Sequence, residues 1–139
     1  MQTIRELVDY APIAEDIGKS FIIGYGAGTA CGLVVGFSRN HDNLPLITLN
    51  DTLNCIEKYS GEFGYTFGIA AGLHTLSCQL SKNLKPIQKH AIAGGVAGTF
   101  IGSHWGMKGA IGGGVVGAAL GAGYGYASTN PELLKYFTK

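Results

Sequence analysis

Charge is scarce in this sequence. Asp, Glu, Lys and Arg make up only 14% of the 139 residues, against about 25% in a typical soluble protein. The formal net charge is +1, so the chain lacks the basic face that binding to nucleic acid requires. Proline is also rare, with four residues, whereas glycine supplies 23. Disordered low-complexity chains mix glycine with proline, serine and glutamine, so the composition predicts an ordered, apolar chain.

Cysteine is too rare to hold the fold together. The chain has three cysteines, Cys31, Cys55 and Cys78, which form neither a disulfide framework nor the paired spacing of a zinc site. We therefore expect no metal and no cofactor. Residues 1–10 lack an apolar run and carry Glu6 and Asp9, unlike a secretory signal or an Arg-rich presequence. We expect any targeting information to be internal.

Glycine is concentrated in four stretches without a single charged residue, at residues 21–38, 63–80, 91–106 and 109–127. These stretches contain 21 of the 23 glycines, so the enrichment depends on position. Each stretch is 16 to 19 residues long, near the lower limit of the roughly 17–25 residues that a membrane-spanning helix needs. Hydropathy alone does not decide the matter, because glycine and alanine contribute little to it.

Within each stretch, glycine recurs at every fourth position, which places small residues along one face of a helix. An interior glycine costs a helix in water about 1 kcal/mol relative to alanine. In lipid an unpaired backbone group costs several kcal/mol, so the helix remains the favoured state, and a face of small residues lets a second helix approach closely. The predicted packing residues are Gly24, Gly28, Gly32, Gly36, Gly64, Gly68, Gly72, Gly94, Gly98, Gly102, Gly106, Gly109, Gly113, Gly117, Gly121 and Gly125. We predict an all-α membrane protein, a single domain over residues 1–139 with four glycine-zipper transmembrane helices.

Short amphipathic segments are expected around the four spans. Thr3 and Glu6 resemble a capping box that opens a short helix, which Pro12 is expected to end. Asn50 or Asp51 is expected to cap a second helix that begins well before its span. Two further expectations are that Pro86 occupies the first position of the third helix and that the chain ends in an amphipathic turn after Asn130-Pro131, with Leu133, Leu134, Tyr136 and Phe137.

Few residues suggest chemistry. Gly112, Gly114 and Gly117 spell the dinucleotide motif G-x-G-x-x-G, but no buried strand precedes them, so we expect a helix face there and no nucleotide site. His74 and His104 lie inside spans, where ionisable residues are functional candidates by default. We expect neutral imidazoles bonded to neighbouring helices, because no span contains an acidic residue. We expect neither an enzyme nor an ion-coupled carrier.

Lys82, Lys85 and Lys89 form a basic segment without an acidic residue between Ser81 and His90. Lysines are common where a span meets the aqueous phase, so an ordinary positive flank is one interpretation. The other is a binding site for anionic lipid headgroups, cardiolipin if the membrane is mitochondrial.

Residues 61–82 (GEFGYTFGIAAGLHTLSCQLSK) contain a Tyr-Thr-Phe helix that closes on a cysteine, and residues 91–114 (AIAGGVAGTFIGSHWGMKGAIGGG) a Gly-Gly-x-x-Gly helix with a short His-containing hairpin. Over residues 20–127 the chain resembles the Tim17/Tim22/Tim23 family, most nearly its B14.7-type accessory subunits of respiratory complex I (NADH:ubiquinone oxidoreductase). Many family members carry an arginine where this chain has the neutral Gly102-Ser103-His104, so a role that depends on that arginine does not transfer.

The resemblance implies a multi-pass protein of the mitochondrial inner membrane without redox cofactors. Such a subunit would pack against membrane-arm subunits of complex I and hold phospholipid, cardiolipin above all. An alternative is a component of an inner-membrane protein translocase, whose working surface would be a polar helix face. The second helix carries five polar residues that keep this alternative open: Thr66, His74, Thr75, Ser77 and Gln79.

Overall fold

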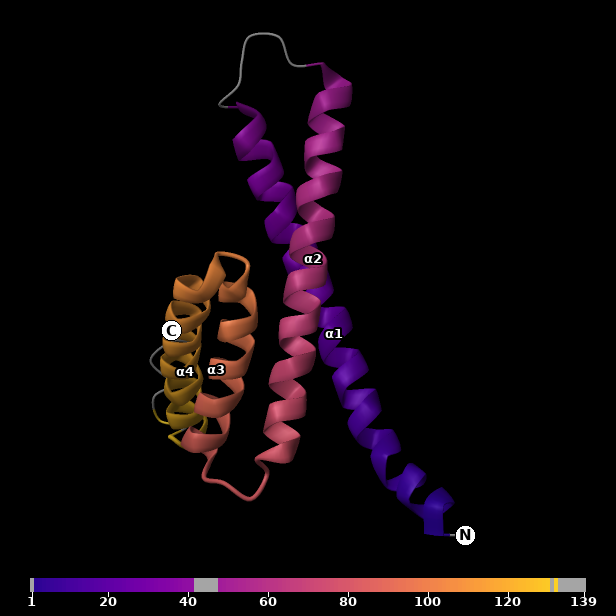
Figure 1. Ribbon diagram of the computed structural model, residues 1–139, viewed down its shortest axis with the longest axis vertical. Coiled ribbons are helices and arrows are strands. Elements are labelled where there is room, and N and C mark those ends of the chain that lie inside the picture. The colour runs from indigo at the N-terminus through magenta and orange to yellow at the C-terminus, as the bar shows by residue number, and fades with distance from the viewer. Residues whose placement is uncertain (1, 42–47, 131, 133–139) are drawn as a thin grey trace. The chain divides into compact units, whose positions relative to one another are not determined.

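The computed structural model describes residues 2–41, 48–130 and 132, with the side chains of residues 10–38, 48–130 and 132. Those residues form the helices α1 (Gln2–His41), α2 (Leu49–Leu80), α3 (Pro86–Ser103) and α4 (Gly106–Thr129), and no strand (Figure 1). The predicted all-α fold is confirmed. The chain divides into two compact units, residues 18–72 and residues 1–17 with 73–139.

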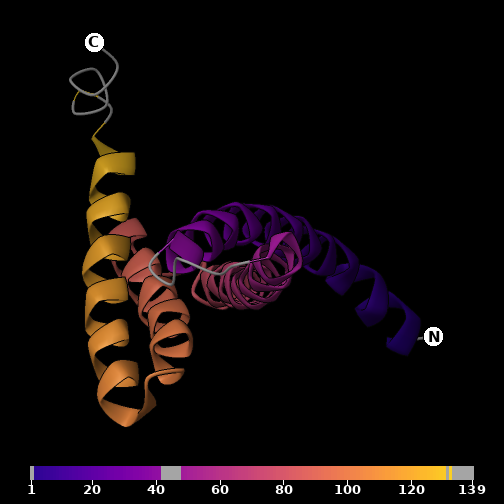
Figure 2. The same cartoon turned by 90° about the horizontal axis from the view of Figure 1, so that it is seen from above.

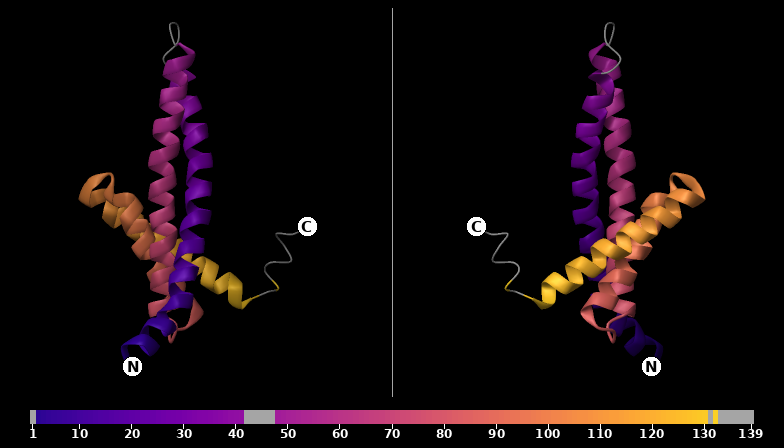
Figure 3. Two further views of the ribbon diagram at one scale, coloured as in Figure 1. Left: turned by 90° about the vertical axis from the view of Figure 1, so that its right-hand side faces the viewer. Right: turned by 90° about the vertical axis from the view of Figure 1, so that its left-hand side faces the viewer.

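In the unit of residues 18–72, α1 and α2 are antiparallel neighbours (Figure 3). Gly24 of α1 lies against Phe67 of α2, and Gly36 lies against Ile56. The contact residue on α2 therefore moves back along the chain as the glycine on α1 moves forward. Two tyrosines also connect this pair: the rings of Tyr25 of α1 and Tyr65 of α2 pack edge to face with their centroids 5.3 Å apart.

In the other unit, α3 and α4 form a tight antiparallel hairpin (Figure 2). The two helices are joined only by His104 and Trp105. The amide of Trp105 donates to the carbonyl of Gly102 over 3.0 Å, and Gly106 follows with a φ of +76°. Only glycine adopts that backbone conformation without strain, so Gly106 allows α4 to start directly after the turn.

Two predicted helix ends are wrong. The short N-terminal helix does not stop at Pro12, which lies inside the continuous α1. An interior proline removes one backbone hydrogen bond and kinks or breaks many helices, but here the helix continues on both sides. The third predicted span, residues 91–106, also runs too far, because α3 ends at Ser103 and Gly106 already belongs to α4.

The helix starts follow recognisable capping chemistry. Pro86 opens α3, as predicted. The cap of α2 is Thr48, two residues before the predicted Asn50 and three before Asp51. The amide of Asp51 donates to the Thr48 hydroxyl over 3.3 Å, and the amide and the hydroxyl of Thr48 donate to the Asp51 carboxylate over 3.2 Å and 2.6 Å. This is a reciprocal capping box. The hydrogen bonds from Thr48 lower the pKa of Asp51 below its ordinary value of 3.8.

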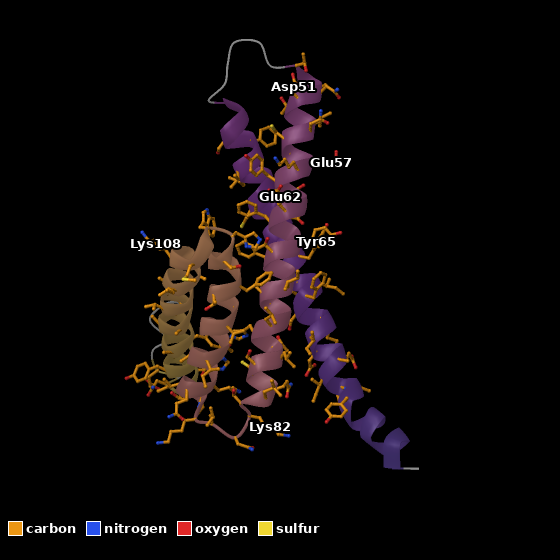
Figure 4. The ribbon with its side chains drawn as sticks, viewed as in Figure 1. Asp51, Glu57, Glu62, Tyr65, Lys82 and Lys108 are labelled. Carbon is orange, nitrogen blue, oxygen red and sulfur yellow. The ribbon has the colours of Figure 1, made fainter. Side chains whose placement is uncertain are left out.

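The second helix begins well before its predicted span, as expected. Its first half carries acidic residues, of which Asp51, Glu57 and Glu62 lie along α2 in Figure 4. The predicted C-terminal turn at residues 131–137 lies outside the described residues apart from Glu132.

By length and composition, one described helix is apolar enough to cross a membrane, at Tyr10–Ser38 with a mean hydropathy of 1.6. The other described helices do not reach the same mean hydropathy over a span-length window. Four membrane crossings therefore stay a prediction.

Candidate functional site

The interior of this protein is made of small residues. Among the described side chains, the buried apolar ones are Ala70 and Ala93, with 4% and 0% of their surface exposed. Large apolar side chains point outward instead, for example Ile111 and Leu120 of α4, which are 64% and 70% exposed. This distribution is the reverse of a soluble core, and it presents apolar surface to lipid or to other helices.

The α3–α4 hairpin is held by glycine against glycine. A Cβ added at Gly98 would lie 3.0 Å from the Cα of Gly117 and closer still to the backbone of Gly113. A Cβ at Gly94 would meet the backbone of Gly117, and one at Gly102 would meet that of Gly109. Carbon atoms prefer about 3.5–4.0 Å, so the two backbones are closer than any larger side chain allows.

The glycine face of α4 continues beyond these pairs. Gly121 lies against the backbone of His90, and a Cβ at Gly125 would lie 2.8 Å from the Cα of Ile87. The motif residues Gly112 and Gly114 lie inside the same helix. A Cβ at Gly112 would meet nothing within 4 Å. The G-x-G-x-x-G spelling therefore marks a helix, as expected, and not a phosphate-binding loop.

The α1–α2 pair uses glycine in a different way. The glycines of α1 meet the backbone of α2, because a Cβ at Gly32 would lie 2.6 Å from the Cα of Ser60. Glycines of α2 instead make room for side chains of α1: Gly64 lies against Thr29 and Tyr25, and Gly68 against the ring of Phe21, 3.0 Å from an added Cβ. Aromatic side chains of α1 thus fill the hollows that glycine leaves in α2.

Gly106 is placed differently from the other predicted packing glycines. A Cβ there would meet nothing within 4 Å, and the residue is exposed. Its positive φ, and not a neighbouring helix, is what requires glycine. Gly72 is buried in α2.

An open groove of about 600 Å³ runs along the face of the hairpin. Besides glycines it is lined by His74 of α2 and by Ala97, Ile101, Trp105, Val116 and Leu120. Its volume is in the range of small-molecule pockets. His74 is its one titratable lining residue, so the groove offers a mainly apolar surface with one titratable group.

Polar groups gather at the end of the hairpin where α2 leads into α3. Lys82 and Lys85 are exposed there, and Lys89 is half-buried. Figure 4 places Lys82 at this end and Lys108 at the opposite end of the hairpin. The side-chain amide of Gln79 donates to the Asp16 carboxylate over 3.3 Å. The lysine segment is thus available to an anionic partner.

Beside the lysines lie three metal-ligating side chains, His74, Cys78 and His90. From the sequence, His74 was a functional candidate, whereas Cys78 was expected to take no part in a metal site and His90 was assigned no role. A spacing of four residues puts His74 and Cys78 on one helix face, so the sequence already indicated that these two side chains are neighbours. Only the short turn before Pro86 brings His90 of α3 to them. His104 lies apart, in the α3–α4 turn, where its ring approaches the carbonyl of Ile101 at 3.2 Å.

Comparison with known proteins gives one result. A model of the Tim17/Tim22/Tim23/Pmp24 family matches residues 13–121. The chain belongs to this family. Tim17-family proteins are helical proteins of the mitochondrial inner membrane, so the predicted family and its membrane character are confirmed. No curated protein and no solved structure matches the chain.

Proposed function

We propose that this Tim17-family chain is a non-enzymatic structural subunit of an inner-membrane protein assembly. The observation that carries the proposal is the inverted distribution of side chains. Glycine and alanine fill the helix contacts, while the large apolar residues of α4 are mostly exposed. A protein built in this way presents its outer helix faces to partner helices and lipid.

All four helices cross the membrane in this proposal. At 1.5 Å per residue, the 18 residues of α3 and the 24 of α4 extend about 27 Å and 36 Å, close to the roughly 30 Å of a hydrocarbon core. The backbone contacts between α3 and α4 support this placement, because close glycine packing is the means by which membrane helices associate. The protein should remain in the pellet after carbonate extraction. Release into the supernatant would refute membrane integration.

The membrane arm of complex I is the assembly we favour. The groove on the hairpin is apolar apart from His74, which suits a helix or a lipid chain and not the passage of a hydrophilic polypeptide. As an accessory subunit the chain would stabilise the arm and carry no redox centre. It should co-migrate with complex I on native gels of mildly solubilised mitochondria.

A translocase component is the second candidate. The family description itself favours it, since it includes Tim17, Tim22 and Tim23. The polar pair of Gln79 and Asp16 also lies near the end of α2. This candidate predicts crosslinks between α2 and a precursor stalled during import. Crosslinks to a precursor without co-migration with complex I would replace the first candidate by the second.

Assembly should depend on the hairpin. We expect Gly117→Leu to lower incorporation into the assembly, because a side chain at that position meets the backbone of Gly94 and the Cα of Gly98 at 3.0 Å. Gly123→Leu is the matched control, since a Cβ there meets nothing within 4 Å. Mass spectrometry of native-gel slices measures both. Equal incorporation of the two variants would contradict the proposed role of the glycine face.

Phospholipid is the remaining proposed partner. Lys82 and Lys85 are exposed at the α2–α3 turn and have no acidic neighbour in sequence, which suits the two phosphates of cardiolipin. Native mass spectrometry should detect retained cardiolipin, and Lys82→Gln with Lys85→Gln should reduce it. Lys108→Gln, at the other end of the hairpin, is the control. Unchanged retention in the double variant would refute this site.

A further inference from the structure

His74, Cys78 and His90 direct their donor atoms at one point. Cys78 lies one helical turn after His74 on α2, and His90 lies on α3 beyond the short turn. The Cys78 Sγ is 3.9 Å from the Nδ1 of His74 and 3.7 Å from the Nδ1 of His90. One ligand atom from each residue lies within 4.8 Å of the other two. All three side chains are half-buried.

These distances are close to those of a zinc site. Zinc takes thiolate at about 2.3 Å and imidazole at about 2.0–2.1 Å in a tetrahedral arrangement, which puts a sulfur and a nitrogen ligand about 3.6 Å apart. The two sulfur–nitrogen distances of Cys78 are longer by only a few tenths of an ångström. All three candidate ligand atoms lie within 4.8 Å of one another.

Two imidazole nitrogens approach the same sulfur. A thiol is a weak hydrogen-bond donor and a weak acceptor, so hydrogen bonds hold this cluster less firmly than a shared metal ion would. The rings of His74 and His90 also stack, with centroids 5.8 Å apart and planes at 21°. Two imidazoles and a thiolate around one point match the ligand preference of zinc and of other borderline or soft metal ions.

We propose that His74, Cys78 and His90 bind one zinc ion. The three residues are the protein ligands, and the fourth position is open. His74 also lines the hairpin groove, so the groove can supply a water molecule or a donor from a partner at that position. Structural zinc sites have four protein ligands, whereas sites with three keep an exchangeable position.

Zinc at this site would fix the end of α2 to the beginning of α3. Between the ligands lies the turn with Lys82 and Lys85, so the ion would hold the lysine segment in place. His90 is itself supported by α4: its ring meets Tyr124 edge to face at 4.9 Å, and Gly121 packs on its backbone. The site therefore joins three helices of one unit. This inference does not depend on which assembly the chain enters.

Zinc binding is measured on the full chain in detergent, freed of metal by a chelator and titrated against a chromophoric zinc indicator. We expect one equivalent to bind. His74→Ala, Cys78→Ser and His90→Gln should each weaken binding by at least about 100-fold, since loss of a group that merely orients a metal ligand already costs about 10–100-fold. His104→Ala and Cys31→Ser are the matched controls. Binding that survives in all three ligand variants would overturn the proposal.

A second measurement needs no variant and so does not depend on mutant folding. The three cysteines are free, and Cys31 and Cys55 lie outside the cluster. Zinc should slow alkylation of Cys78 by N-ethylmaleimide while leaving Cys31 and Cys55 unchanged, as read by peptide mass spectrometry. Equal protection of all three cysteines, or none, would refute the site. Protection by Cu⁺ but not by zinc would refute zinc as the ion.

Discussion

The packing of α3 on α4 can be tested with two neighbouring glycines of one helix. Gly113 lies on the face of α4 that packs against α3. A Cβ added at Gly113 would lie 3.0 Å from the Cα of Gly102 and 3.1 Å from the carbonyl carbon of Gly98. Gly112, one residue earlier, faces open space. Gly112→Ala and Gly113→Ala therefore add the same methyl group to the same helix, but only one of them meets a neighbouring backbone.

The size of the difference follows from these contacts. Carbon atoms prefer about 3.5–4.0 Å, so alanine at residue 113 requires α3 to move out by about 0.5–1 Å, which forfeits about a quarter to a half of the dispersion attraction across the gap. Overpacking of this kind costs about 1–3 kcal/mol. Both alanines gain the same helix propensity, about 1 kcal/mol, which cancels in the comparison. We expect Gly113→Ala to be less stable than Gly112→Ala by roughly 1–3 kcal/mol.

The assay can use the one tryptophan of the chain. Trp105 lies in the α3–α4 turn, and its Cβ would be 2.8 Å from a Cβ added at Gly109, so its fluorescence reports on the hairpin. Unfolding is followed by titrating dodecyl sulfate into the detergent-solubilised protein. Gly123→Ala, also in open space, is a second control. Equal stabilities of the two variants, or a more stable Gly113→Ala, would refute close glycine packing as the basis of the hairpin.

Three further predictions concern single residues. Gly106→Ala should destabilise the hairpin by about 1–2 kcal/mol despite the open space around it, because an L side chain at its φ of +76° is strained. Gly106→Asn should destabilise it less. Equal unfolding midpoints for the original protein and the two variants would exclude the strain. The Asp51 carboxyl should titrate below 3.8 in an NMR pH titration and return toward that value in Thr48→Ala. Its capping contribution is then present above pH 3.8 and is lost as the pH falls through the lowered pKa, so an unshifted titration would contradict the capping box. Pro12→Ala should slow amide exchange in the first turns of α1, because an interior proline is about 3 kcal/mol less favourable than alanine in a helix; unchanged exchange would contradict a continuous helix.

Much of the helix packing was predictable, because the spacing of the glycines shows which face of a helix a neighbouring helix can approach closely. A step of four identified the faces of α3 and α4, and the two-residue turn makes Gly102 and Gly109 opposing residues once the helices are antiparallel. Which helices pair was not contained in the spacing, since each helix shows the same step. The aromatic residues Phe21 and Tyr25, which distinguish the α1–α2 pair, were not assigned a role from the sequence.

The helix ends and the metal-ligand cluster were harder to predict. Pro12 has a strong local preference to end a helix, but α1 continues through it. Gly106 fits the four-residue step and was assigned to the packing face, whereas a positive φ depends on how tightly two helices are joined. His90 approaches His74 and Cys78 only because the chain reverses between α2 and α3. A contact between residues on two different helices produces no recognisable spacing in the sequence.

The two helix pairs differ in how firmly their alignment is set. Opposing glycines repeat every four residues along both α3 and α4, so sliding one helix by four residues, about 6 Å, again opposes glycine to glycine. The hairpin has several nearly equivalent alignments, and the brevity of the His104–Trp105 connection selects among them. In the α1–α2 pair the rings of Phe21 and Tyr25 lie opposite Gly68 and Gly64, so a shift there also has to move two aromatic side chains. Lengthening the His104–Trp105 connection would therefore release α3 and α4 into shifted pairings.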